Sequence, residues 1–493
     1  MCGFVGIVGR TDCAADILLG LQALQHRGQD AAGVGTITSG SFPIKRRSGL
    51  VAQNFGPEEI EQLPGIAGIG HVRYPTLGSG TLRDAQPFFY RQPGVLMAHN
   101  GNFISVKQMQ DYLADESVHL MSRCDMEPML CIFSLELMRI RRKNHTVDDA
   151  LIALRNTFRY AQGAYSLVGA LVLDGVESLI AVRDPLGIRP AVWGRRDNSI
   201  IVASESVALD ALHARVEGDV PPGELMVFRP DGTVEQHRIH PGKSTPCIFE
   251  YIYFARPDSI MNTESVYSVR LELGRELARA WKAKGLAADV VIPIPDTSRP
   301  SAGALAEELK LPYREGFIKN RYTGRTFIMQ TNERSNALRL KLNPITSEFV
   351  DRRVLLVDDS IVRGSTLQRT IQLVREQGVK EVHLAIHSPP VVHPCYYGID
   401  MSTYEELAAP AFRSSPREEP PTEEDHKEVE RRLASQLGVD SLTYLPLAGL
   451  KKAFPHPCCA ACFDGNYPLP ISEEVRKWIE EDRNTCYQRN LIL

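Results

Sequence analysis

The 493-residue sequence lacks several features that would indicate other classes of protein. Its formal net charge at pH 7 is only −4, and it contains no block of lysine and arginine, so nothing predicts binding to nucleic acid or a membrane surface. The longest apolar run, residues 164–182, is interrupted by Asp174 and Glu177 and is typical of a strand hairpin, not of a membrane span. The N-terminus lacks a basic region, so we expect no signal peptide.

Cysteine is also sparse. Ten cysteines in a chain of this length do not form a disulfide scaffold, which favours a reduced, cytoplasmic setting. The length predicts two or three domains with ample core. A content of 43% hydrophobic and 24% charged residues is ordinary for a globular protein, so composition alone indicates no function.

The most informative stretch is VLLVDDSIVRGST, residues 354–366. Four apolar residues predict a short buried strand, followed by the acidic pair Asp358–Asp359, a loop of small residues and a helical pattern. In an open α/β sheet, ligands lie at the carboxyl ends of the strands, and backbone N–H groups at a helix start bind anions. The stretch therefore predicts a phosphate site, with a solvated turn after a strand as the alternative.

The same stretch resembles the phosphoribosyl-pyrophosphate (PRPP) loop of type I phosphoribosyltransferases. Its amino-acid sequence is most similar to that of the glutamine PRPP amidotransferase family. The resemblance implies that Asp358 and Asp359 hold the ribose hydroxyls and Mg²⁺. It implies that Thr297, after the expected strand 288–296, supplies a third metal ligand, a hydroxyl oxygen suited to Mg²⁺. The loop that would bind the 5′-phosphate consists of Ser360, Ile361, Val362, Arg363, Gly364, Ser365 and Thr366.

Cys2 follows the initiator methionine and becomes the N-terminal residue if Met1 is removed. It would then carry a thiol nucleophile and a free α-amine, whose ordinary pKa of about 7.7–8.0 suits a general base at neutral pH. A small core residue is the other interpretation of a cysteine at this position.

Four further segments favour catalysis: HRGQD (26–30), GHVRYPT (70–76), AHNGN (98–102) and CDME (124–127). With Cys2 they resemble the glutaminase domain of N-terminal-nucleophile (class II) amidotransferases. The resemblance assigns Arg73 to the α-carboxylate of glutamine, Asp125 to its α-ammonium, and Asn100 with Gly101 to the oxyanion, which needs preorganised donors. Residues implied to shape or close the pocket are Arg27, His71 and Thr76. We interpret His99 as a packed strand histidine.

The predicted organisation is an α+β glutaminase domain of the αββα sandwich type over residues 2–235, then an α/β type I phosphoribosyltransferase domain with a parallel sheet over 248–470. A helical tail is expected over 471–493. Apolar residues from Val266 to Trp281 predict a helix.

The basic stretch 317–342 is interpreted as a lid over PRPP, with a solvated connector as the alternative. The Pro- and Glu-rich stretch 411–425 is expected to be a surface loop without an assigned function.

Four cysteines lie in sequence contexts that resemble those of an iron–sulfur subgroup of the same family: Cys247, Cys395, Cys459 and Cys462. The resemblance implies that they hold a [4Fe–4S] cluster with a structural or oxygen-sensing role. Thiolates also suit Zn²⁺, so the chemistry of the ligands leaves both metals open, and four unrelated buried cysteines are a further alternative.

The predicted function is synthesis of 5-phosphoribosylamine from PRPP, glutamine and water, the first step of purine synthesis. The resemblance also implies feedback by purine nucleotides and a homotetramer. One alternative is an amidotransferase that feeds a sugar-phosphate isomerase or an asparagine synthetase domain. A second is a catalytically silent nucleotide-binding regulator, because phosphoribosyltransferase folds can serve as sensors.

Overall fold

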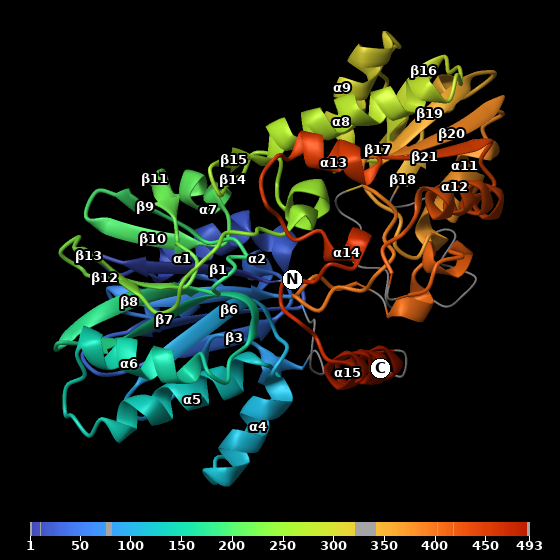
Figure 1. Ribbon diagram of the computed structural model, residues 1–493. Coiled ribbons are helices and arrows are strands. Elements are labelled where there is room, and N and C mark those ends of the chain that lie inside the picture. The colour runs from blue at the N-terminus through green and yellow to red at the C-terminus, as the bar shows by residue number, and fades with distance from the viewer. Residues whose placement is uncertain are drawn as a thin grey trace.

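Figure 1 shows the computed structural model, which describes residues 2–9, 11–74, 81–320, 342–401, 403–417 and 419–490. The chain folds into two halves that differ in their layers. The N-terminus lies at the junction between the halves, and helix α15 (Glu473–Asn490) lies close to the same junction (Figure 1). No helix in the described part of the chain is both long and apolar enough to cross a bilayer.

The first half is built on two stacked antiparallel sheets. One sheet has the strand order β11 (Arg215–Asp219), β9 (Val192–Arg196), β10 (Ser199–Ala203), β1 (Gly3–Val8), β4 (Ala67–Arg73), β2 (Ala31–Ile37) and β3 (Ile44–Ser48). The other has the order β13 (Val234–Arg238), β12 (Glu224–Phe228), β8 (Val176–Arg183), β7 (Gly163–Leu173), β6 (Val95–Phe103) and β5 (Phe88–Tyr90).

Apolar residues from both sheets fill the space between them, where Phe4 and Ile69 of one sheet meet Leu96 and Val168 of the other. Helices cover the two outer faces. The helices of this half are α1 (Ala14–Ala23), α2 (Val51–Asn54), α3 (Pro57–Glu61), α4 (Val106–Asp115), α5 (Met126–Arg139), α6 (Val147–Thr157) and α7 (Ser206–Ala211), with short 3₁₀ turns η1 (Gln25–Arg27) and η2 (Leu82–Asp84). Because α1 and α7 pack on the first sheet and α5 and α6 on the second, the layers are αββα.

The second half contains a parallel sheet with the strand order β16 (Val290–Pro293), β19 (Arg353–Asp358), β20 (Glu381–Ile386) and β21 (Ser441–Tyr444). Two small antiparallel pairs accompany it, β14 (Ile260–Met261) with β15 (Glu264–Ser265) and β17 (Phe317–Lys319) with β18 (Leu342–Pro344). The helices are α8 (Val266–Ala283), α9 (Arg299–Leu309), α11 (Ser365–Arg375), α12 (Glu423–Leu437), α13 (Leu447–Ala453) and α14 (Ala461–Asp464), with short helical turns η3 (Glu250–Phe254), η4 (Thr346–Glu348), η5 (Tyr404–Glu406) and η6 (Pro410–Phe412).

Both predicted fold classes are confirmed, the αββα sandwich and the parallel α/β sheet that follows it. The expected hairpin is β7 and β8, turning at Asp174 and Gly175, and the expected helical stripe lies on α8, where Val266, Leu273 and Trp281 are buried. The described residues of the stretch 411–425 lie at the surface apart from Asp425, which accepts hydrogen bonds from Ser414, Ser415 and Thr422 and so fixes the start of α12. The proposed lid falls mostly on residues 321–341, outside the described residues.

Candidate active sites

Cys2 directly precedes β1, in the middle of the first sheet. Gly3 pairs with Val72, so Cys2 lies beside the end of β4, and its thiol donates a hydrogen bond of 3.4 Å to the carbonyl of Tyr74. Arg73, the last residue of β4, is 3% exposed and lies 3.6 Å from Asp84. The pairing of β1 with β4 therefore brings the thiol next to the cation that the sequence assigns to the glutamine carboxylate.

Asn100 and Gly101 lie in the middle of β6, in the second sheet. Asn100 is completely buried, and neither its Nδ2 nor its Oδ1 atom has a hydrogen-bond partner among the described residues. A buried amide without a partner costs free energy, so such groups usually have a ligand or another function. Gly101 has a φ of +146°, and a Cβ there would lie 2.1 Å from the carbonyl oxygen of Ala164, so only glycine fits.

Asp125 lies directly before α5 and faces the same strand. Its Oδ2 atom accepts a hydrogen bond of 3.0 Å from the Phe103 backbone N–H and lies 3.3 Å from His99 Nε2. Burial disfavours its charged form, but His99, the Phe103 N–H and Arg73 outweigh burial and lower the pKa of Asp125. Asp125 is therefore a carboxylate at neutral pH, as a partner for an ammonium must be.

His71 connects the two sheets at this edge. Its Nε2 atom lies 3.1 Å from the carbonyl of His99, so a strand of each sheet is tied to the other beside Asn100. Burial, and then the charges of His99 and Arg73, lower the pKa of His71 well below its ordinary value. His71 is therefore neutral, and it forms a buried part of the contact between the two sheets.

Arg27 lies under the N-terminal residue and is completely buried. Its Nε atom donates a hydrogen bond of 2.9 Å to the carbonyl of Cys2, and its two terminal nitrogens bond to Glu205 and Glu250. Burial disfavours its charged form, but the two carboxylates outweigh burial and raise the pKa of Arg27. Arg27 thus contacts the main chain of the nucleophile and two buried acids.

Sequence reasoning left several of these contacts out. His99 is packed, as predicted, yet it also contacts Asp125, while Asp84 pairs with Arg73. Glu205 and Glu250 were not predicted as site residues. No pattern in the sequence marks them, because each meets its partner across more than 170 residues of chain. Thr76, also predicted to line the pocket, lies outside the described residues.

The acidic pair of the second half lies at the carboxyl end of the central strand β19. Asp358 is half-buried and Asp359 is buried, and the Ser360 hydroxyl donates a hydrogen bond of 2.6 Å to Asp359 Oδ1. Burial, and then the neighbouring Asp359, raise the pKa of Asp358 well above its ordinary value. Burial likewise raises the pKa of Asp359 to about 6, although Ser360 and Arg270 oppose it. Two carboxyls on consecutive residues, one of them buried, form an oxygen-rich site that favours a cation.

The loop after the pair leads directly into α11. Ile361 is buried and anchors the loop, and Gly364 has a φ of +79° at the residue before the helix. Ser365 and Thr366, the first two residues of α11, are exposed, as is Arg363, whose guanidinium lies 3.0 Å from Glu406. Hydroxyls and N–H groups at an open helix start can bind an anion such as phosphate.

Thr297 follows the neighbouring parallel strand β16 and is partly exposed. In the register of the two strands Pro293 lies opposite Val357, so Thr297 and Asp358 come after the same edge of the sheet. The residue before Thr297, Asp296, pairs with Lys319 at 2.7 Å and with Arg299. The sheet therefore brings the three expected Mg²⁺ ligands to one edge, next to basic side chains.

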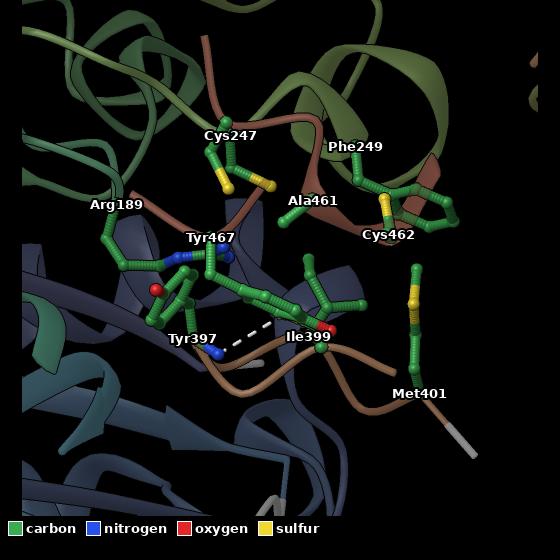
Figure 2. Close-up of a pocket in the computed structure, with 11 residues that line it drawn as sticks. Arg189, Cys247, Phe249, Tyr397, Ile399, Met401, Ala461, Cys462 and Tyr467 are labelled. Carbon is green, nitrogen blue, oxygen red and sulfur yellow. Dashed lines mark hydrogen bonds between the residues drawn. The ribbon is translucent and has the colours of Figure 1, made fainter. Parts of the chain in front are cut away.

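The four cysteines that the sequence groups together line one cavity at the junction of the halves, shown in Figure 2. All four are buried, and Cys247 forms an isolated parallel bridge with Cys459. The backbone N–H groups of Val392 and His393 donate to the Cys462 carbonyl, which ties the segment of Cys395 to that of Cys462. Arg189, from the first half, lines the same cavity beside Phe249, Tyr397 and Tyr467.

Among the residues that the structure describes, no group of three or more His, Cys, Asp or Glu side chains is arranged to hold a metal ion. Four buried thiols nevertheless line one cavity, and soft thiolates are ligands both for iron–sulfur clusters and for Zn²⁺. Burial lowers the pKa of Arg189, but Cys247, Glu250 and the other thiols outweigh it and raise that pKa. A fixed cation therefore lies where four thiolates would add negative charge.

Comparison with known families gives matches in both halves. A family model of the glutamine amidotransferase domain matches residues 76–211, and one of the phosphoribosyl transferase domain matches residues 270–388. The first match covers Asn100, Gly101 and Asp125, and the second covers Thr297 and the acidic pair.

Relatives match over most of the chain. The amidophosphoribosyltransferase of Methanothermobacter thermautotrophicus is 39% identical, over 97% of this chain and 96% of its own length. That of Escherichia coli is 44% identical, over 83% of each chain. Among solved structures, glutamine PRPP amidotransferase from B. subtilis, complexed with ADP and GMP, superposes with a TM-score of 0.83 at 33% identity, covering 96% of this chain and 98% of that one.

Proposed function

The chain belongs to the amidophosphoribosyltransferase family, and from that premise we propose how its own residues carry the reaction. It converts PRPP, glutamine and water to 5-phosphoribosylamine, glutamate and pyrophosphate, the first step of de novo purine biosynthesis. Its second half argues against a sugar-phosphate isomerase or an asparagine synthetase as the acceptor domain, because that half matches a phosphoribosyl transferase. The roles of individual residues, the metals and the regulation are the proposals that follow.

In the first half, Cys2 Sγ attacks the side-chain amide carbon of glutamine, and the α-amine of Cys2 accepts the thiol proton and passes it to the departing ammonia. The resulting thioester is hydrolysed by water to glutamate, which frees the thiol. The observation that carries this proposal is the buried side-chain amide of Asn100, which has no hydrogen-bond partner among the described residues and lies in the sheet that faces the nucleophile's sheet. That amide and the Gly101 N–H supply the donors that a developing oxyanion requires.

Glutamine is held by opposite charges at its α-carbon. Arg73 binds the carboxylate and Asp125 binds the ammonium, and the lowered pKa of Asp125 supports its charged form. Both groups are at most 4% exposed, so their attraction for a zwitterion is screened little by water. This arrangement selects a free amino acid over an amide within a protein chain.

In the second half, Asp358, Asp359 and Thr297 would hold Mg²⁺ and the ribose hydroxyls, while the loop from Ser360 to Thr366 binds the 5′-phosphate. Their oxygen atoms are the ligands that Mg²⁺ prefers, and the metal would neutralise charge on the leaving pyrophosphate. Ammonia attacks the anomeric carbon, pyrophosphate leaves with the bonding electron pair, and a proton is lost from nitrogen. Ammonia passes between the halves without equilibrating with solvent, since free ammonia would be protonated and diffuse away.

The cavity at the junction would hold a [4Fe–4S] cluster through Cys247, Cys395, Cys459 and Cys462. The support is the placement of four buried thiols and a buried guanidinium around one space. As ligands the thiols would be thiolates, so assembly releases protons and the bound cluster contributes to the stability of the junction.

A coupled assay tests these proposals together. Protein purified without oxygen is given glutamine, PRPP and Mg²⁺, and pyrophosphate release is measured while iron and sulfide are determined on the same sample. We expect turnover that persists in the presence of an enzyme that consumes free ammonia, with about four iron atoms per chain. Loss of turnover with that scavenger would refute direct delivery, and one zinc per chain without sulfide would refute the cluster.

Regulation and assembly are proposed by analogy. The B. subtilis relative was solved with ADP and GMP, and we propose that purine nucleotides inhibit this chain as well, which inhibition assays with each nucleotide test. We also propose a homotetramer, which sedimentation analysis tests directly.

A further inference from the structure

A continuous series of buried ionic contacts joins Cys2 to the four-cysteine cavity. Arg27 donates to the carbonyl of Cys2 at 2.9 Å and to Glu250 Oε1 at 2.8 Å. The same Glu250 oxygen accepts a hydrogen bond of 3.2 Å from Arg189, which lines the cavity (Figure 2). Glu250 is therefore a carboxylate shared by the guanidinium of Arg27, which contacts Cys2, and the guanidinium of Arg189 beside the cysteines.

Glu250 is fixed by the second half of the chain. It begins η3, a short π-helix, an uncommon conformation that often occurs at functional sites. Arg270 of α8 donates hydrogen bonds of 2.8 and 2.7 Å to the carbonyls of Tyr251 and Ala255, and His387 Nε2 lies 3.1 Å from the carbonyl of Ile252. These contacts fix the η3 turn within the second half, and the Glu250 carboxylate at its start binds Arg27 of the first half.

The charges of this series are nearly all removed from water. Arg27, Arg189 and Glu205 are completely buried and Glu250 is 1% exposed, so the pairs are held in a low dielectric where geometry matters strongly. Removing the charge of Glu250 leaves two guanidinium groups with one fewer counter-charge. Arg27 must then move or repair its contacts, and the carbonyl of Cys2 moves with it.

A second contact reaches the oxyanion strand from the cysteine segment itself. Gly398, three residues after Cys395, has a φ of +99°, and a Cβ there would lie 2.9 Å from the carbonyl carbon of Gly101. Asn102 Nδ2 donates a hydrogen bond of 3.1 Å to the carbonyl of Tyr396 in the same segment. The segment that carries Cys395 is therefore packed directly against the backbone of Gly101.

We propose that Glu250 and Gly398 are positioning residues for glutamine hydrolysis, through which the four-cysteine segments of the second half hold Cys2 and Gly101 in their working geometry. Neither residue touches glutamine. Glu250 acts on the nucleophile through Arg27, and Gly398 acts on the oxyanion donor by direct packing. The inference rests on the proposed roles of Cys2 and Gly101, and it gives the cysteines a function in the ammonia-producing reaction.

Two pairs of variants test it in the full-length, cluster-containing enzyme. Glu250→Gln is compared with Glu276→Gln, another buried glutamate of the second half that contacts neither arginine of the series. Gly398→Ala is compared with Gly285→Ala, which also has a positive φ, +64°, but has nothing within 4 Å of the added methyl group. The readouts are kcat and KM for glutamine, synthesis from ammonia and PRPP, iron content, and the rate at which iodoacetamide alkylates Cys2.

We expect Glu250→Gln and Gly398→Ala to lower kcat for glutamine by roughly 10- to 100-fold, because small displacements of reacting groups cost that much. KM for glutamine, synthesis from ammonia and iron content should stay near wild type, and both controls should behave as wild type. Glu250→Gln should also change the alkylation rate of Cys2, whereas Gly398→Ala should not.

Two results would overturn the inference. One is an unchanged kcat for glutamine in both test variants. The other is a parallel loss of iron and of ammonia-dependent synthesis, which would make the residues structural only. A wild-type enzyme without ammonia-dependent synthesis would instead refute the proposed function, and the alkylation rate of Cys2 would still test the role of Glu250.

Discussion

The glutaminase centre and the PRPP site are built in opposite ways. The first collects Cys2, Arg73, Asn100 and Asp125 from four distant segments, and none of them is more than 8% exposed. The second takes most of its groups from thirteen consecutive residues, and Arg363, Ser365 and Thr366 are exposed at the open end of a sheet. One site is assembled by long-range pairing, and the other by a single strand–loop–helix unit.

The difference in burial carries a difference in electrostatics. The charges around Cys2 are balanced inside the protein, since Glu205 and Glu250 accompany Arg27. At the PRPP site, Asp358 and Asp359 lie together and both pKa values are raised by burial. Arg27 therefore has its counter-charges within the chain, whereas the second site holds two neighbouring carboxyls for which we propose a cation as the partner.

The sharpest separation of the two sites comes from Cys2→Ala. Without the thiol, glutamine-dependent synthesis should fall by roughly 10⁴-fold or more, because loss of a nucleophile removes the covalent route altogether. Synthesis from ammonia and PRPP should be retained, and pyrophosphate release under both conditions measures it. An equal fall in synthesis from ammonia and PRPP would mean that the second half depends on Cys2 for its own activity.

The next effect concerns stability. Glu205→Gln should destabilise the first half by about 3–5 kcal/mol, because it leaves Arg27 buried with one fewer counter-charge. Burial opposes the charged form, but His26 and Arg27 outweigh it and hold the pKa of Glu205 below its ordinary value of 4.5. This contribution is therefore present above pH 4.5 and is lost as the pH falls further. Hydrogen exchange in β1 and β10 at pH 7 and pH 4 measures it, with the variant expected to lose less protection on acidification.

Asn100→Ala should lower kcat for glutamine by roughly 10²–10³-fold with little change in KM, since an oxyanion donor acts mainly in the transition state. Single-turnover formation of the thioester measures the effect on the chemical step. A large rise in KM with unchanged kcat would assign Asn100 to substrate binding instead.

Asp359→Asn should raise the Mg²⁺ and PRPP concentrations needed for ammonia-dependent synthesis, lowering kcat/KM for PRPP by roughly 10- to 100-fold, which is the loss of one charged contact. Asp351→Asn, an exposed residue before the same strand, is the matched control and should be silent. Glutamine hydrolysis by Asp359→Asn should be unaffected in the absence of PRPP. If it fell as well, the two sites would share more than ammonia.

The sequence predicted the strand, loop and helix around Asp358 and Asp359 well, because local order is enough there. A run of four apolar residues, an acidic pair and a small-residue loop specify strand, turn and helix start with little help from the rest of the chain. The role expected for Thr297 came from the family resemblance, and the structure adds that its strand and the strand of Asp358 end at a common edge of the sheet.

The glutaminase centre could be predicted only as a set of separate segments. Nothing local relates Arg27 to Glu250 or Gly398 to Gly101, because these pairs are separated by more than 200 residues and meet through sheet stacking and the junction of the halves. Arg27 was predicted only to shape the glutamine pocket, and the buried acids that its charge requires became visible only in the structure.

The C-terminal helix α15 places a condition on the order in which the chain matures. Arg483 on this helix donates hydrogen bonds to the carbonyls of Cys395 and Met401, and so clamps the segment that packs on Gly101. Ribosomes add about 5–20 residues per second, so Arg483 emerges roughly half a minute to a minute and a half after Cys2. If the segment has the positioning role that we propose, a nascent chain lacks this clamp until the helix translated hundreds of codons after Cys2 has emerged.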